Sequence, residues 1–176
     1  DNVRKIKKRW CIDIVQEEER PDKSIKTLSS RRIIPIHNTL IDLGFLDFLQ
    51  ILKKKHPKRE RIFEELRYIG GSYNKNVSKF WNVRYLPKLG LKTSKKNFHS
   101  LRHTVTDHLK QKGVEPHFVK ELLGHSSGEG EWDRYGKNYE PEIMFNKCIK
   151  RIVYKTSQNS SVDFRRLKVD WKKIMN

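Results

Sequence analysis

The chain of 176 residues has only two cysteines, far fewer acidic than basic residues, and no long apolar run. Cys11 and Cys148 are too few for a disulfide framework or a cysteine-rich metal site, so we expect buried, reduced thiols. No apolar stretch is long enough to cross a bilayer, and the first residues show no signal-peptide pattern. These absences argue against a disulfide-stabilised secreted domain and against a membrane protein, and we expect a cytoplasmic protein.

Basic residues dominate the charged part of the composition. Lys and Arg number 39 against 21 Asp and Glu, which gives a formal net charge of +18 and a pI near 10.0. An evenly solvated surface is the simpler interpretation of such a charge. The basic residues nevertheless cluster at 4–9, 53–55, 92–96 and 172–173. Such patches favour a polyanionic partner, whose phosphates would dominate a salt-dependent affinity.

One segment combines imidazole, guanidinium and phenol groups. It reads H-S-L-R-H from residue 99, L-L-G-H from residue 122 and R-Y-G from residue 134. A helix should begin at Ser100, whose hydroxyl can cap it. Its apolar positions are Leu101, Val105 and Leu109, which should face inward. An anion at its N-terminal end would meet unpaired N–H groups, the positive end of the helix dipole and the guanidinium of Arg102.

A second helix should follow directly. Gly113 suits the end of the first helix, and Pro116 suits the first turn of the next. Val119, Leu122 and Leu123 give the second helix an apolar stripe. Gly124 should end it and reverse the chain, so that His125 emerges at a turn.

These strings, in this order, resemble the tyrosine recombinase (phage integrase) family. The segment 25–36 also resembles the β-hairpin that carries that family's catalytic lysine, so the likeness covers most of the chain. The pattern predicts an α+β fold that is mainly α: a helical catalytic domain with a small antiparallel β-sheet. It implies site-specific breakage and rejoining of duplex DNA by four protomers on DNA, encoded by a bacterium or phage.

The resemblance also implies residue roles. Tyr135 would attack a DNA phosphodiester and become joined to the 3′ phosphate, while Lys26 would protonate the departing 5′ oxygen. Arg102 and His125 would bind the non-bridging oxygens, and His99 would accept the tyrosine proton or orient the phosphate. No cofactor and no metal would be needed. Two lysines just before His99, Lys95 and Lys96, could grip the DNA backbone beside the cut.

One family motif has no match. A first arginine in a Gly-x-Arg-x-x-Glu context is not found in this sequence. We therefore expect residues 1–155 to be a catalytic domain truncated at its N-terminus, and residues 156–176 to be a linker and basic tail. Two rival functions follow: a DNA-binding fragment without cleavage activity of its own, and a type IB topoisomerase-like relaxing enzyme.

Single residues also have simpler interpretations. Lys26 could be an ordinary edge-strand lysine. Tyr139 competes with Tyr135 as nucleophile, although the spacing from His125 favours Tyr135. His103 and His108 are expected to serve packing or to face solvent.

The expected elements are a strand at 10–15, a turn at 16–23, and a hairpin formed by 25–28 and 31–36. Helices are expected at 39–55, around 77–86, and at 141–153.

Overall fold

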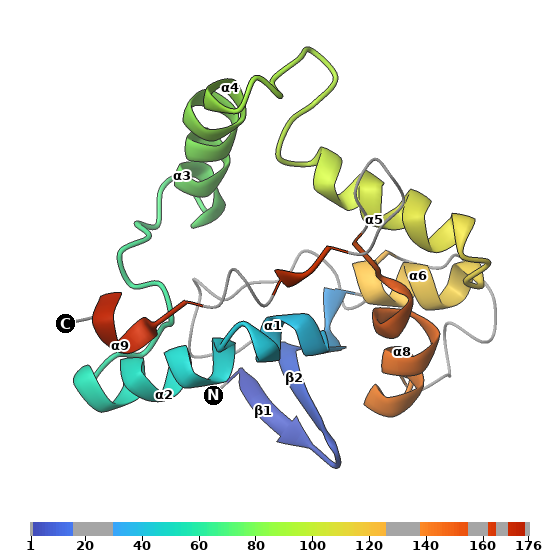
Figure 1. The fold of residues 1–176 in the computed structure, drawn as a ribbon, viewed down its shortest axis with the longest axis horizontal. Helices are drawn as coiled ribbons and strands as arrows, with labels where there is room; N and C mark the ends of the chain where they lie inside the picture. Colours follow the sequence, from blue (N-terminus) through green and yellow to red (C-terminus); the bar gives the residue numbers. More distant parts are fainter. Residues whose placement is uncertain (1, 16–29, 126–137, 155–161, 165–168, 175–176) are drawn as a thin grey trace.

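The computed structural model describes residues 2–15, 30–125, 138–154, 162–164 and 169–174 (Figure 1). Helices dominate, and the strands form one three-stranded antiparallel sheet of order β1-β2-β3. The predicted fold class, α+β and mainly α, is confirmed. Among the described residues, no helix combines the length and the apolar character that crossing a membrane requires.

The sheet consists of β1 (Val3–Ile6), β2 (Arg9–Ile14) and β3 (Arg32–Pro35). Strand β2 was predicted, but β1 was read only as a basic cluster. β3 pairs with β2, with Cys11 opposite Pro35 and Ile14 opposite Arg32. The other expected arm of the lysine hairpin, 25–28, lies outside the described residues.

The expected single helix at 39–55 is two helices, α1 (Asn38–Asp42) and α2 (Phe45–Lys55). Gly44 separates them in the left-handed conformation, with φ of 88°, which a residue with a side chain adopts at a cost. The indole of Trp171, in the short helix α9 (Trp171–Ile174), covers this break and packs against Phe48 with ring centroids 4.9 Å apart. The prediction of an unbroken helix was therefore wrong.

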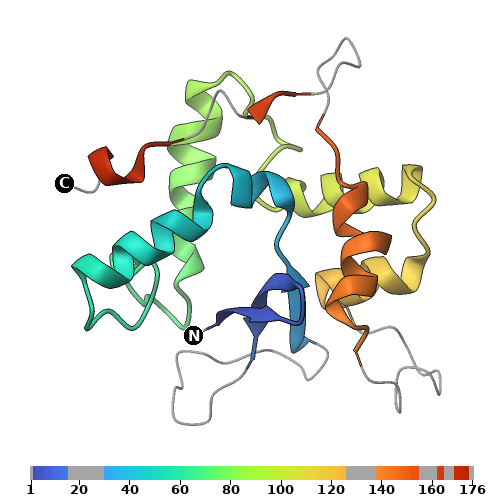
Figure 2. The same ribbon diagram turned by 60° about the horizontal axis from the view of Figure 1, so that its bottom comes forward.

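A column of three consecutive elements follows: α3 (Asn74–Lys79), the π-helix η3 (Phe80–Tyr85) and α4 (Leu86–Lys88). In Figures 1 and 2 this green column stands apart from the yellow and orange helices. Trp81 packs on Tyr85 within the column, with ring centroids 4.8 Å apart. It also packs on Phe98 in the loop before α5, with ring centroids 5.5 Å apart. The helix expected around 77–86 is confirmed and is longer than predicted.

The hydrophobic core lies between α5 (Ser100–Gln111), α6 (Pro116–Leu123), α8 (Pro141–Lys147) and the 3-10 helix η4 (Ile149–Arg151). Its buried members come from all four elements: Leu109, Phe118, Val119, Leu122, Met144, Phe145, Cys148 and Ile149. Ile34 of β3 packs against it, which joins the sheet to the helices. The last expected helix, 141–153, is correct in its start, but its α-helical part ends at Lys147.

Two residue predictions about the core have opposite outcomes. Cys11 and Cys148 are buried as expected, and neither is in a disulfide. Burial raises the pKa of Cys148 to about 11. Leu101 was expected to face inward, but 48% of it is exposed. The core reaches α5 at Val105 and Leu109 and does not extend to its first turn, so that prediction was wrong.

Candidate active site

The turn after α6 organises the candidate site. Gly124 adopts φ of 66°, and the N–H groups of Gly124 and His125 donate to the carbonyls of Glu121 (3.0 Å) and Lys120 (2.9 Å). This is the glycine-terminated helix end expected from the sequence. Exposed His125 therefore emerges at a fixed reversal, as predicted.

Two arginines from different elements bind the last carbonyls of α6. Arg102 of α5 donates from Nη2 to the carbonyl of Leu123 at 2.6 Å. Arg32 of β3 donates from Nε to the carbonyl of Leu122 at 3.0 Å, and from Nη1 to the carbonyl of Ser30 at 2.6 Å. The carboxyl end of a helix carries a negative partial charge, so both guanidinium groups lie where a cation is stabilised.

Sequence reasoning assigned a site role to Arg102 and none to Arg32. The sequence marks Arg32 only as a basic residue in a strand. Its approach to α6 depends on how β3 packs against that helix, which local patterns do not encode. An arginine at the start of a segment that otherwise carries apolar residues was the available signal.

Like charges gather at this turn. The pKa of Arg32 is lowered by burial and by the nearby charge of Arg102. The pKa of His125 is lowered by burial and by the charges of Arg102, Arg32 and Lys120. Within the described part of the chain, no carboxylate forms an ion pair with Arg32 or Arg102. Such a cluster of positive groups suits an anion.

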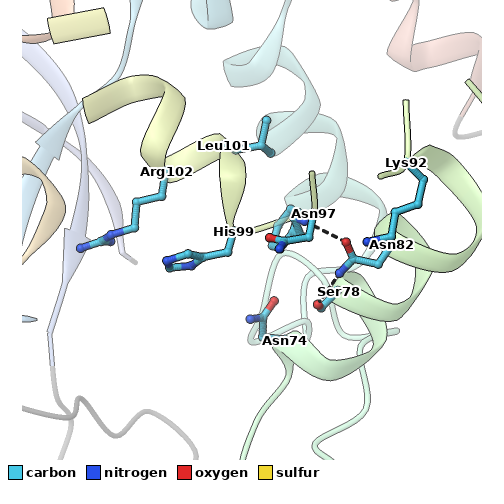
Figure 3. Close-up of a pocket in the computed structure, with 9 residues that line it drawn as sticks. Asn74, Ser78, Asn82, Lys92, Asn97, His99, Leu101 and Arg102 are labelled. Carbon is cyan, nitrogen blue, oxygen red and sulfur yellow. Dashed lines mark hydrogen bonds between the residues drawn. The ribbon is translucent and has the colours of Figure 1, made fainter. Parts of the chain in front are cut away.

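A cavity of about 650 Å³ adjoins the cluster, between the column and the first turn of α5. Figure 3 shows the side chains of His99 and Arg102 pointing away from Asn82 and Ser78, while Lys92 lies on the same side of the cavity as Asn82. The lining residues come from both regions: Asn74, Ser78, Asn82, Lys92, Asn97, Phe98, His99, Leu101 and Arg102.

The loop that leads into α5 is fastened to the column by Asn82. Its Oδ1 accepts the N–H of Phe98 at 2.9 Å, and its Nδ2 donates to the hydroxyl of Ser78 at 3.1 Å. The predicted capping role of Ser100 is wrong, because its hydroxyl accepts from the N–H of Asn97 and donates to the carbonyl of Lys95. Ser100 thus closes the preceding loop, while the Asn97 side chain accepts the N–H of Ser100 at 3.2 Å.

The predicted site residues fall into three groups. His99, Arg102 and His125 are described, and the first two line the same cavity. Lys95 and Lys96 are exposed on the loop before α5. Lys26 and Tyr135 lie outside the described residues.

The competing residues are occupied elsewhere. Tyr139 is half-buried and packs on Phe118, with ring centroids 4.6 Å apart. The imidazole of His108 lies 3.1 Å from the carbonyl of Arg151, which makes it a packing residue as expected. His103 is exposed, and its ring lies 5.0 Å from that of His99 in an edge-on arrangement.

The chain downstream of residue 137 is anchored beside the site. The N–H of Tyr139 donates to Oε1 of Glu121 at 2.9 Å, and Nδ2 of Asn138 donates to the carbonyl of Arg31 at 3.3 Å. One bond joins the segment to α6, and the other joins it to the residue next to Arg32.

Fold and site together define an α+β domain with a cluster of arginine and histidine suited to an anion. The profile of the Phage integrase family matches residues 6–142, and the chain belongs to that family. The family predicted from the sequence is therefore confirmed.

A curated relative is similar over part of its length. Tyrosine recombinase XerC of Actinobacillus succinogenes (strain ATCC 55618 / DSM 22257 / CCUG 43843 / 130Z) is 32% identical over 103 residues, which are 56% of this chain and 32% of the relative. The matched part of the chain thus spans about a third of that protein. No solved structure matches.

Proposed function

We propose that this chain breaks and rejoins DNA strands through a covalent bond between Tyr135 and a 3′ phosphate. The observation that carries this proposal is the convergence of Arg102, Arg32 and His125 on one helix end, with no described carboxylate to neutralise them. Membership of the phage integrase family supports DNA as the source of the phosphate.

In the proposed reaction the phenol oxygen of Tyr135 attacks phosphorus, and the bond from phosphorus to the 5′ oxygen breaks. His99 accepts the phenol proton, and Lys26 gives a proton to the leaving 5′ oxygen. Arg102 and His125 bind the non-bridging oxygens, on which negative charge grows in the transition state. The new ester keeps the energy of the old one, so a 5′ hydroxyl of another strand can reverse the step without added energy.

The lowered pKa of His125 fits this role. Desolvation at the turn and the positive neighbours of His125 favour the uncharged imidazole in the free protein, which can donate one hydrogen bond to a phosphate oxygen. A bound phosphate brings negative charge to the same place and favours the protonated form. Phosphate binding and protonation of His125 are therefore coupled.

Contacts to the rest of the DNA are part of the proposal. Lys95 and Lys96 hold the backbone beside the cut phosphate, and four copies of the chain assemble on two duplex sites. Residues 1–155 form the catalytic part, and 156–176 form the linker and tail. Support comes from the exposed position of both lysines and from the formal charge of +18.

A nicked duplex that loses a short fragment after cleavage tests the chemistry, because it traps the protein–DNA adduct. We expect an adduct with the unchanged protein and none with Tyr135→Phe. Tyr139→Phe is the matched control and should keep the adduct, since its ring packs on Phe118. Adduct from Tyr135→Phe would contradict the choice of nucleophile.

Binding without cleavage is the second candidate function, because the sequence has no arginine in a Gly-x-Arg-x-x-Glu context. It predicts a shifted DNA band and no adduct from any variant. A relaxing enzyme of the type IB class would instead form the adduct and relax a supercoiled plasmid without joining two sites.

A further inference from the structure

Arg32 links three parts of the fold. It belongs to β3, where it lies opposite Ile14 of β2, and its half-buried side chain reaches the end of α6. One guanidinium nitrogen donates to the carbonyl of Leu122, and another donates to the carbonyl of Ser30, two residues before Arg32 in the chain. The planar group therefore holds the strand and the helix end at a fixed separation.

Gly124 makes room for this guanidinium. A Cβ atom built on Gly124 would lie 2.8 Å from Cζ of Arg32 and 3.3 Å from its Nε, and it would also collide with Nη1. Real Cβ atoms do not approach so closely, so any side chain at this position would displace Arg32. Two features therefore favour glycine at position 124: its φ of 66° and the close approach of the Arg32 guanidinium.

Arg32 and Arg102 bind successive carbonyls, of Leu122 and Leu123. Two guanidinium groups on neighbouring peptide units repel each other, and partial burial adds to the cost. A structure that needed only a helix cap would be served by one of them. The second cation raises the positive potential where His125 emerges.

We infer that Arg32 is a positioning residue of the active site, which fixes the turn at residues 122–124 to strand β3 and thereby holds His125 beside Arg102. This inference rests on the proposed function for the identity of the anion, a DNA phosphate. The positioning itself is a property of the free protein and is measurable without DNA.

The charged groups that face His125 come from three elements: Arg102 of α5, Arg32 of β3 and Lys120 of α6. Loss of one positive neighbour should raise the pKa of His125. Arg31 offers a matched control, because it is the adjacent residue in sequence, carries the same charge and is exposed.

The first experiment is an NMR titration of the histidine side chains in the full chain without DNA. The His125 signal is assigned from the His125→Gln spectrum. We expect a higher pKa of His125 in Arg32→Gln, and a pKa equal to that of the unchanged protein in Arg31→Gln. Equal values in the two variants would overturn the inference.

The second experiment separates position from charge. Arg32→Lys keeps the charge but cannot bind two carbonyls with one planar group, and Gly124→Ala displaces the guanidinium without removing it. In single-turnover adduct formation we expect both to be about a hundredfold slower, with DNA affinity within about threefold of the unchanged protein. An unchanged rate in Arg32→Lys would show that charge alone matters and would overturn the positioning role.

The two outcomes distinguish the inference from the proposed function. Absence of adduct from the unchanged protein would remove the proposed chemistry, while titration of His125 in Arg32→Lys, which keeps the charge, would still decide the positioning role of Arg32. If Arg32→Gln does not fold, Arg32→Lys and Gly124→Ala carry the titration, with a shifted His125 signal expected in both and an unshifted one counting against the inference.

Discussion

The two sides of the cavity are built differently. On one side, α5, α6 and α8 share a buried core in which Leu109 has no exposed surface. On the other, the column of α3, η3 and α4 buries Leu86, while Phe80 and Val83 remain 51% and 62% exposed (Figures 1 and 2). Of the described lining residues, His99 and Arg102 lie at the start of α5, and Asn74 and Asn82 lie on the column.

This difference matches two different demands. Phosphoryl transfer requires donors held within a fraction of an ångström, which a packed core and paired backbone carbonyls provide. Under the proposed function, a column that contacted duplex DNA would have to fit a surface far larger than one phosphate. Few buried contacts lower the free energy of local opening in the column. The column also contains the π-helix η3. Such helices occur mostly as short segments and are frequent at functional sites.

The largest expected effect separates the two ends of α5. Leu109→Ala should lower the free energy of unfolding by about 2–5 kcal/mol, because it leaves a cavity in the core. Leu101→Ala should change it by less than about 1 kcal/mol, since 48% of that residue is exposed. Urea denaturation of both variants measures the contrast, and equal losses would mean that α5 is packed evenly along its length.

The lysines of the loop before α5 should contribute to the affinity for DNA. If Lys95 and Lys96 each contact one phosphate, the double change to Gln should reduce the slope of log affinity against log salt by about 1.8. Fluorescence anisotropy with a labelled duplex at several salt concentrations gives this slope. Lys53 and Lys54, at the last turn of α2, provide the matched double change to Gln, for which we expect a smaller loss.

A smaller effect tests how the column is joined to the core side. Asn82→Ala removes the acceptor for the N–H of Phe98 and should cost about 1 kcal/mol of unfolding free energy. Ser78→Ala removes only the other bond of Asn82 and should cost less. We expect faster amide hydrogen exchange at Phe98 in Asn82→Ala alone. The same exchange rate in both variants would mean that Trp81 stacking, not Asn82, holds the loop.

The smallest effect concerns acid and lies away from the cavity. Arg9 binds Glu142 and lowers the pKa of that carboxyl to about 2. Because this pKa is below the unfolded value of about 4.5, the pair stabilises the fold above pH 4.5, and the effect is lost as the pH falls toward 2. Unfolding measured from pH 6 to pH 2.5 should therefore be less acid-sensitive in Glu142→Gln. An identical pH dependence would contradict the pairing.

Local sequence signals predicted much of the fold. Pro116, Gly124 and the apolar stripe between them define α6 without reference to any other element. The break at Gly44 was not predicted, because a glycine inside an apolar helical pattern is tolerated unless something packs against it, and here Trp171 does. β1 was missed because two of its four residues are basic, and its strand conformation depends on pairing with β2.

The positions of three candidate residues were predictable from helix ends. His99 and Arg102 lie at the start of α5, and His125 lies at the turn after α6. Arg32 and Asn82 were not predictable in this way, since each acts through a carbonyl or an N–H group far away in sequence. Ser100 shows the opposite case, in which a strong local preference for capping yields to a loop that needs the same hydroxyl.

The bond from Asn138 to the carbonyl of Arg31 limits the reach of the proposed nucleophile. Tyr135 lies three positions before Asn138, and a fully extended chain covers about 11 Å over that length. Asn138 is tied next to Arg32, so this short tether favours delivery of the phenol to the phosphate held by the same polypeptide. Within an assembly of several copies, each subunit would then cut the strand that it binds itself.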